Sequence, residues 1–185
     1  MNDFGNKLKN PARVNELAPA ETLKKSGLGD NDVFCDIGAG VGVFTIPAAM
    51  ITRNKVYALD INDESLEVVR SITEKEKLKN VKALHIKNYP YNIPDESVDY
   101  VLLCTVFHEI DDKDSLLSEI KRVVKKDRRL VVIEFHKRKT PMGPPVAKRI
   151  AKNEVSIFAS NYGFKKVQYF KLGDNFYCLI LQKIS

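Results

Sequence analysis

The chain has 185 residues, of which 44% are hydrophobic and 29% are charged. These are ordinary values for a globular protein with room for one hydrophobic core, and they exclude wholesale disorder. The net charge of +6 is moderate, so it is compatible with a well-solvated surface, an anionic small molecule or nucleic acid as a partner.

The three cysteines, Cys35, Cys104 and Cys178, lie in separate apolar runs, and no CxxC pair occurs. This pattern is typical of core residues in a reducing compartment, not of a disulfide framework or a metal cluster. The first ten residues lack the apolar core of a secretion signal, and no apolar run approaches the ~20 residues that cross a bilayer. We therefore expect a cytoplasmic protein. No feature of the sequence specifies an oligomeric state.

Apolar, β-branched runs alternate along the chain with segments of helical period, as a parallel α/β sheet requires. The first 18 residues are polar and show neither pattern. After them the sequence predicts, in chain order, a helix at Pro19–Ser26, a strand at Val33–Ile37, a helix at Gly42–Thr52, a strand at Val56–Asp60, a helix at Asp63–Lys77, strands at Val81–Ile86 and Val98–Thr105, a helix at Asp112–Lys126, a strand at Leu130–Phe135, a helix at Val146–Asn161, and strands at Phe164–Lys171 and Phe176–Gln182.

The short LGDN connection near the C-terminus predicts a hairpin between the last two strands. We therefore expect a doubly wound, mostly parallel sheet of seven strands with an antiparallel last strand. We see no boundary between domains, so we predict one domain over residues 1–185. In it, residues 1–30 form an N-terminal segment that covers the site and residues 31–185 form the core.

The segment VFCDIGAGVG, residues 33–42, carries the most information. A buried strand reaches Asp36, and the chain then turns through Gly38, Gly40 and Gly42 into a helix. Glycines let the backbone turn sharply and let a ligand approach closely. Asp60 ends the next strand, where a carboxylate can accept hydrogen bonds from ribose hydroxyls. Together these features predict a site for an adenosine-type ligand at the carboxyl ends of the strands.

The same loop argues against a dinucleotide. In the GxGxxG fingerprint counted from Gly38, the third glycine would stand at Val43, and counted from Gly40 it would stand at Thr45. Both registers fail, and the loop reads DxGxGxG instead. A nicotinamide-dependent dehydrogenase is therefore the weakest of the alternatives.

With this loop and Asp60, the chain resembles the class I S-adenosylmethionine-dependent methyltransferases from about Val33 to its C-terminus. VDYVLLCTVFHEI is similar to the fourth strand of that family with its following loop, and SLLSEIKRVVKKDRRLVVIEF is similar to the next helix and strand. The usual Pro-Gly turn is altered here, near Lys126–Asp127. The nearest group is the small-molecule branch that includes the ubiquinone/menaquinone C-methyltransferases.

The resemblance implies S-adenosylmethionine as the cofactor in a Rossmann-like fold. It implies that Asp36 and the glycine loop line the methionine portion, that Asp60 holds the ribose, and that Ile61 packs on the adenine. Asn88, followed by Tyr89, stands where the family often has an acidic residue that reaches the adenine amino group. The full set of expected cofactor-binding residues is Asp36, Gly38, Ala39, Gly40, Gly42, Asp60, Ile61, Asn88, Tyr89 and Cys104.

His108 and Glu109 follow the fourth strand and are the candidate catalytic residues. Methyl transfer from a sulfonium is an in-line displacement, so the protein mainly has to hold the acceptor close and aligned. We hypothesise that His108 orients or deprotonates the acceptor; the alternative is a hydrogen-bonded structural residue at a strand end. Glu134 and His136 flank the end of the fifth strand, and none of these residues has the spacing of a metal site.

The loop His136–Pro145 is basic and contains prolines and glycine. Such a loop at a strand's carboxyl end can close over a pocket, and Lys137, Arg138 and Lys139 would then recognise an anionic acceptor. A solvated basic surface is the alternative.

The leading function is methylation of a small molecule. An RNA methyltransferase fits the pI of about 9.1, but CTVFHEI is not the Asn/Asp-Pro-Pro-aromatic signature of the nucleic-acid enzymes. A cofactor-binding module without catalysis is the third reading.

Overall fold

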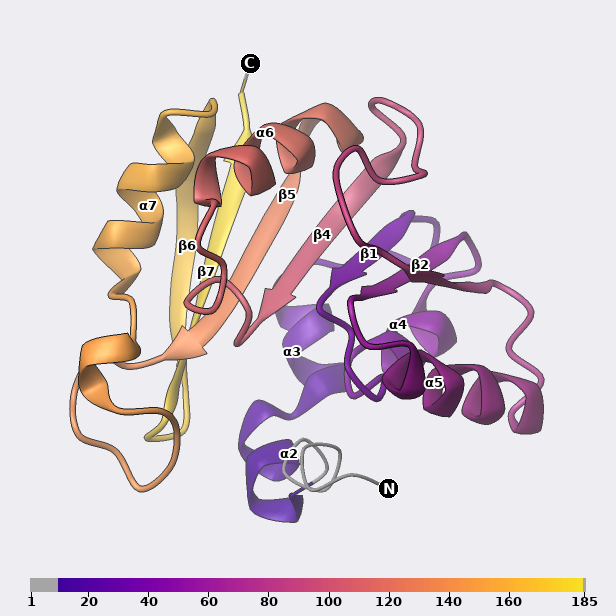
Figure 1. Ribbon diagram of the computed structural model, residues 1–185, viewed down its shortest axis with the longest axis horizontal. Coiled ribbons are helices and arrows are strands. Elements are labelled where there is room, and N and C mark those ends of the chain that lie inside the picture. Colours follow the sequence, from indigo (N-terminus) through magenta and orange to yellow (C-terminus); the bar gives the residue numbers. More distant parts are fainter. Residues whose placement is uncertain (1–9, 185) are drawn as a thin grey trace. The chain divides into compact units, whose positions relative to one another are not determined.

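The computed structural model describes residues 10–184. Its elements follow one another as in Figure 1: α2 (Pro11–Leu17), α3 (Pro19–Lys25), β1 (Phe34–Ile37), α4 (Thr45–Ile51), β2 (Val56–Asp60), α5 (Asp63–Lys75), β3 (Val81–His85), β4 (Val98–Cys104), α6 (Lys113–Val123), β5 (Val124–Phe135), the 3-10 turn η1 (Val146–Lys148), α7 (Lys152–Ser160), β6 (Phe164–Leu172) and β7 (Phe176–Lys183). Helix α2 lies in the polar segment for which the sequence predicted no element.

The strands form a seven-stranded sheet in the order β3-β2-β1-β4-β5-β7-β6. β1, β2 and β3 pair in parallel, as do β4 and β5, and β7 is antiparallel to both β5 and β6. The predicted doubly wound sheet with an antiparallel last strand is confirmed. The chain divides into two compact units, which meet in sequence between Asn88 and Tyr89. A single domain whose residues 1–30 cover the site stays a prediction, and residues 1–9 of that segment lie outside the described part.

In the first unit, helix α5 packs on β2 and β3 and against the glycine loop that follows β1. The buried cluster joins Val69 and Leu66 of α5 to Ala58 of β2 and Ala39 of the loop. Asn62 caps the helix, because its side chain accepts a hydrogen bond from Ser65 N at 3.0 Å. The glycine loop is therefore part of the hydrophobic core of this unit.

Close packing at Gly42 requires a residue without a side chain. A Cβ atom there would lie 3.2 Å from Cγ2 of Val69 and 3.3 Å from Cγ1 of Ile46. Gly42 also has φ +84°, in the left-handed region that disfavours other residues. Because the backbone is not helical there, α4 begins at Thr45 and not at the predicted Gly42.

In the second unit, β5 is longer than predicted. Helix α6 ends at Val123, and Val124 already pairs with Val98 of β4, so the strand runs from Val124 and not from Leu130. Asp127, where the altered turn lies, has φ +62°. Asp127 thus adopts the left-handed conformation that glycine would favour in the usual Pro-Gly turn. It does so within β5 and not in a turn after a helix.

The predicted helix Val146–Asn161 is interrupted. Residues Val146–Lys148 form η1, Arg149 is extended with ψ 151°, and α7 begins at Lys152. The side chain of Arg149 is buried and donates to carbonyl groups of the preceding loop. The backbone therefore leaves the helical conformation at the residue that anchors this loop.

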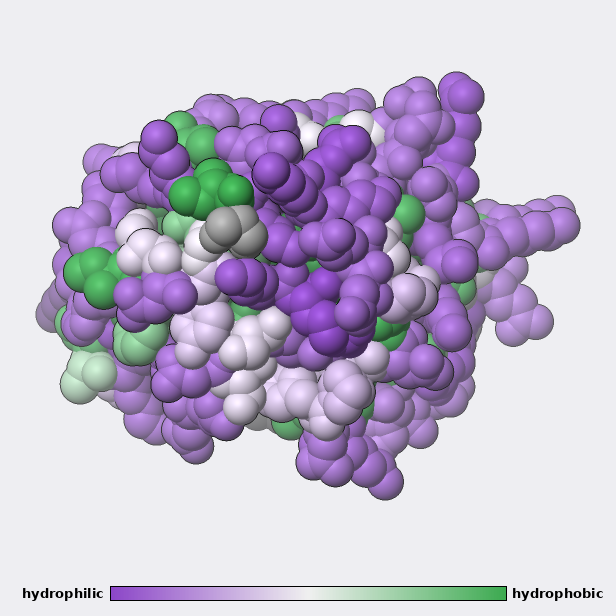
Figure 2. Space-filling view, turned by 90° about the horizontal axis from the view of Figure 1, so that it is seen from above, coloured by the Kyte–Doolittle hydropathy of each residue, from purple (hydrophilic) through white to green (hydrophobic). Residues whose placement is uncertain are grey.

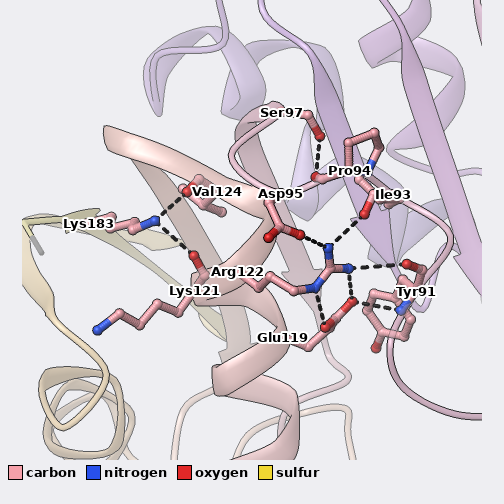
Figure 3. Close-up of polar contacts among 10 residues, drawn as sticks. All are labelled: Tyr91, Ile93, Pro94, Asp95, Ser97, Glu119, Lys121, Arg122, Val124 and Lys183. Carbon is pink, nitrogen blue, oxygen red and sulfur yellow. Dashed lines mark hydrogen bonds and ion pairs between the residues drawn. The ribbon is translucent and has the colours of Figure 1, made fainter.

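An ion pair inside the second unit holds the connection between Tyr91 and Ser97 (Figure 3). Arg122 of α6 donates to both carboxylate oxygens of Glu119, which is only 5% exposed, and to the carbonyl oxygens of Tyr91 and Ile93. Glu119 in turn accepts a hydrogen bond from Tyr91 N at 2.7 Å. The connection into β4 is therefore fixed by polar contacts as well as by packing.

The surface drawn in Figure 2 is mostly hydrophilic, with hydrophobic residues in small separate groups. Within residues 10–184, none of the helices has both the length and the apolar character needed to cross a membrane. Ile61 is the most exposed large hydrophobic residue of the described chain, at 77%. It directly follows Asp60, the acidic residue predicted to hold the ribose.

Candidate functional site

The glycine loop follows β1 and is tied to the end of β2. Gly38, Gly40 and Gly42 all have positive φ, at +75°, +51° and +84°. The carbonyl oxygen of Leu59 accepts hydrogen bonds from both Gly38 N, at 2.8 Å, and Ala39 N, at 2.9 Å. The loop thus turns where only glycine turns readily, and it is held against the neighbouring strand.

Asp60 joins the loop to the end of β2 through both of its oxygens. Oδ2 accepts a hydrogen bond from Gly40 N at 2.7 Å, and Oδ1 accepts one from Asn62 N at 2.8 Å. A carboxylate has about four acceptor positions, so each oxygen keeps one for a ligand. Two fixed acceptor oxygens on a partly buried carboxylate fit two neighbouring hydroxyls of a ribose.

Ile61 presents an apolar side chain next to that carboxylate. Its carbonyl oxygen lies 3.0 Å from Nε2 of His85, which ends β3 in register with Asp60. This contact holds the backbone at Ile61, and an exposed aliphatic side chain there suits the flat face of a base. No motif of the sequence marks His85 as a site residue, although the equal lengths of β2 and β3 place it opposite Asp60.

Asp36 lies inside the same unit and is only 2% exposed. Burial raises the pKa of its carboxyl to about 7; the hydrogen bond from Thr45 Oγ1, at 2.7 Å, opposes this rise, and the charge of Asp60 adds to it. The carboxyl is therefore partly protonated at neutral pH, and a nearby positive charge would favour its ionised form. Thr45 was not predicted, because no pattern marks the first residue of α4 as a partner of β1.

Three other residues that are expected to bind the cofactor come later in the chain than the glycine loop and Asp60; they are Asn88, Tyr89 and Cys104. Asn88 is exposed and ends the first unit, and Tyr89 begins the second. Tyr89 is 39% exposed, and the centroid of its ring lies 5.1 Å from that of Tyr91. Cys104 is the last residue of β4 and is partly buried. Their contact with a cofactor stays a prediction.

His108 of the second unit is held by Glu134 of β5. Its backbone N donates to Oε1 at 3.1 Å, and its ring Nδ1 lies 2.8 Å from Oε2. The side chains are 8% and 1% exposed. Burial alone would lower the pKa of His108, but the hydrogen bond and the negative charges of Glu134 and Glu109 outweigh it, so the pKa is raised.

Glu109 is placed differently from His108. Its side chain is 62% exposed, and Oε1 lies 3.8 Å from Nε2 of His108, which is an ion-pair distance but not a hydrogen bond. The structure therefore brings the two predicted catalytic residues together, with Glu109 on the solvent side. Within residues 10–184, no group of three His, Cys, Asp or Glu residues could hold a metal ion.

Two basic residues of the loop after β5, Lys137 and Arg138, already make polar contacts within the protein. Lys137 Nζ contacts both carboxylate oxygens of Glu154, at 2.9 and 3.0 Å, and Arg138 Nη2 donates to Asp174 O at 3.1 Å. Lys139 is exposed. His136 belongs to this loop, with its ring 5.8 Å from the ring of Tyr177.

Comparison with known proteins shows the family to which the chain belongs. A family model described as a methyltransferase domain matches residues 28–173. The Ubiquinone/menaquinone biosynthesis C-methyltransferase UbiE of Teredinibacter turnerae is 32% identical over 127 residues, which are 67% of this chain and 51% of that protein. The chain thus spans about half the length of the curated relatives it matches.

Two crystal structures match over nearly the whole chain. One, from Aquifex aeolicus, is an S-adenosylmethionine-dependent methyltransferase with a TM-score of 0.91 and 26% identity, covering 98% of this chain and 97% of that one. The other, from Sulfolobus solfataricus, is assigned to the type 11 methyltransferases and has a TM-score of 0.76 and 30% identity, covering 90% and 92%. These matches agree with the resemblance found in the glycine loop and Asp60.

Proposed function

Because the chain belongs to the methyltransferase-domain family, we propose that it transfers a methyl group from S-adenosylmethionine to a small molecule. The observation that carries the proposal is the geometry of Asp60, which fixes the glycine loop through Gly40 N and keeps an acceptor position on each oxygen. S-adenosylmethionine, when bound, supplies a methyl group activated on a sulfonium centre. The match to a C-methyltransferase acting in quinone biosynthesis supports a small-molecule acceptor.

The proposed cofactor site is built mainly from the first unit. Asp60 accepts the ribose hydroxyls, and Ile61 covers the adenine. The buried carboxyl of Asp36 and the close approach allowed by the glycines suit the positively charged methionine portion. The residues proposed to hold the cofactor are Asp36, Gly38, Ala39, Gly40, Gly42, Asp60, Ile61, Asn88, Tyr89 and Cys104.

The acceptor is proposed to meet His108 and Glu109 after β4. In the transfer, the acceptor atom forms a bond to the methyl carbon while the carbon–sulfur bond breaks. Sulfur keeps the electron pair and becomes a neutral thioether, and any proton on the acceptor atom passes to His108. Ligands of open α/β sheets bind at the carboxyl ends of the strands, where both residues lie.

Cofactor binding tests the proposal directly. Calorimetry should show about micromolar binding of S-adenosylmethionine and S-adenosylhomocysteine and none of NAD. Asp60→Asn should weaken this binding ~10- to 100-fold, because a charged acceptor contributes ~1.5–3 kcal/mol to a hydrogen bond. Asp63→Asn is the matched control: it removes a charge three residues away, from an exposed pair with Arg70, and should bind normally. Full-strength binding by Asp60→Asn, or no binding by the folded wild type, would contradict the proposed site.

We also propose that the acceptor is anionic and that the basic loop binds it. Lys137 is paired with Glu154, so Lys139 should supply most of the attraction. With an acceptor identified by transfer of labelled methyl groups, Lys139→Gln should raise KM ~3- to 10-fold, a surface-charge effect of ~1 kcal/mol. Lys137→Gln should raise it less, and neutralising Lys137, Arg138 and Lys139 together should raise it most. An unchanged KM in the triple variant would contradict the proposal that the acceptor is anionic, but it would not contradict the proposed methyltransferase activity.

A further inference from the structure

We propose that Glu134 positions His108 as a general base, keeping Nδ1 of the ring protonated and Nε2 free to take a proton from the methyl acceptor. The inference rests on the proposed function, since the base acts in the transfer described above. It adds a positioning residue and narrows the acceptor to molecules whose methylated atom loses a proton.

The first support is that Glu134 holds His108 at two points. Oε1 accepts from the backbone N and Oε2 lies at hydrogen-bond distance from the ring, so both the chain and the imidazole are fixed by one carboxylate. Glu134 itself is 1% exposed and lies in β5, in register with Tyr177 of β7. A buried side chain on a central strand is a rigid support for a reacting group.

The second support is the direction of the hydrogen bond. An ionised carboxylate only accepts hydrogen bonds, so the ring nitrogen facing Glu134 has to carry the proton. In the neutral ring the other nitrogen, Nε2, is then unprotonated and can act as a base. The ring edge packs toward Phe135, whose centroid lies 6.3 Å away, which limits rotation of the imidazole.

Three charged groups act on the His108 ring. Glu134 and Glu109 favour the protonated ring, and Lys113 of α6 disfavours it. Lys113 donates to Ile110 O and its Nζ lies 5.6 Å from the centroid of the Phe107 ring. The carboxylates outweigh both burial, which is the largest single effect and lowers the pKa, and the charge of the lysine. The pKa of His108 is therefore raised, and Nε2 is a stronger base than a free imidazole.

A base at this position selects the class of acceptor. A hydroxyl, an N–H or an acidic C–H loses its proton to Nε2 as the new bond to the methyl carbon forms, so the acceptor remains uncharged at that atom. A sulfide or a tertiary amine has no proton to lose and needs no base. The geometry therefore points to an acceptor of the first kind.

Nuclear magnetic resonance of the imidazole nitrogens tests the positioning without cofactor or acceptor. The chain has three histidines, and His108→Gln assigns the signal of interest. We expect the neutral ring of wild-type His108 to carry its proton on Nδ1 and its pKa to exceed that of a free imidazole. Glu134→Gln should lower that pKa and mix the two neutral forms.

Glu119→Gln is the matched control for the cost of changing a buried glutamate. Glu119 is 5% exposed and also accepts from a backbone N–H, but its partner is Arg122 (Figure 3). This variant should lose stability and leave the His108 signal unchanged. A proton on Nε2 in the neutral wild type would overturn the proposal even if Glu134→Gln fails to fold, and so would a His108 pKa that Glu134→Gln leaves unchanged.

Kinetics then separate positioning from catalysis. In the wild type, kcat should rise as pH rises through the His108 pKa, because only the unprotonated ring accepts a proton. Glu134→Gln should move this rise to lower pH and reduce kcat at its plateau ~10- to 100-fold, with KM within ~2-fold. If methyl transfer occurs without this pH dependence, the base is excluded while the proposed function stands. If no methyl transfer occurs at all, the proposed function fails, and the resonance experiment still decides the state of His108.

Discussion

Replacing Asp36 by asparagine is expected to stabilise the unliganded protein at pH 8 and to weaken its binding of S-adenosylmethionine. Burial raises the pKa of Asp36 to about 7 from the ordinary 3.8, so between these values the folded protein keeps a proton that the unfolded chain has lost. Stability therefore falls as pH rises from about 4 to about 7 and stays at the lower level above it. At ~1.36 kcal/mol for each pH unit, the ionised carboxyl costs up to ~4 kcal/mol at pH 8.

Asparagine removes that cost without removing the contact with α4. Its side-chain oxygen can accept the hydrogen bond from Thr45 that Asp36 now accepts. We expect urea unfolding to show Asp36→Asn more stable than wild type by ~2–4 kcal/mol at pH 8 and nearly equal at pH 4. The exposed Asp63→Asn is the control and should change stability by less than ~0.5 kcal/mol at either pH. A variant less stable than wild type at pH 8 would show that the ionised carboxyl is not strained by burial.

The loss of binding follows from the proposed contact with the cationic methionine portion. An asparagine carries no charge, so affinity should fall ~10-fold or more, and wild-type affinity should rise with pH through about 7 as the carboxyl ionises. Calorimetry at pH 6 and 8 checks both statements. If variant and wild type bind S-adenosylmethionine equally well at pH 6 and at pH 8, Asp36 does not contact the cofactor. The proposed role of Asp60 would be unaffected by this result.

The residues that could be predicted from the sequence share a local signal. Gly38, Gly40 and Gly42 turn where positive φ is needed, and Asp60 ends a strand whose apolar run is continuous. Each of these features is set by neighbours in the chain, so a pattern of a few letters marks it. The alternation of apolar runs and helical periods likewise predicted the order of the strands that carry the loop.

Contacts between distant residues left no such signal. Glu134 and His108 are 26 positions apart and meet because the parallel pairing of β4 and β5 aligns the ends of these two strands. The sequence placed both residues at strand ends but could not show that one holds the other. Thr45 is a similar case, since it reaches Asp36 across the glycine loop.

Arg149 shows tertiary contacts overriding a local pattern. The sequence predicted a continuous helix over Val146–Asn161, yet the chain is extended at this residue. Arg149 is buried, at 6% exposure, and the carbon of its guanidinium group lies 5.4 Å from the centroid of the Phe135 ring. Each of its hydrogen bonds goes to the loop that follows β5, with the acceptors Pro144 O, His136 O, Arg138 O, Thr140 Oγ1 and Met142 O.

Changing Arg149 to lysine should therefore release the basic loop. Lysine keeps the charge but has three donors on one atom, so it cannot reach acceptors spread around a planar fork. Several partly buried carbonyl oxygens would lose their partners, and we expect a loss of ~2–4 kcal/mol in the free energy of unfolding. Urea unfolding measures this, and limited proteolysis should show new cleavage between His136 and Arg149.

Arg70→Lys provides the comparison, because Arg70 is an exposed arginine whose partners Asp63 and Glu67 lie on the same helix. It should change stability by less than ~0.5 kcal/mol, since exposed ion pairs contribute little. If the basic loop binds the acceptor, Arg149→Lys should also raise KM while cofactor affinity stays at the wild-type value. A wild-type stability together with an uncleaved loop would mean that other contacts order this segment without the arginine, such as the hydrogen bonds to Asn175 from His136 N, at 2.9 Å, and from Met142 N, at 3.0 Å.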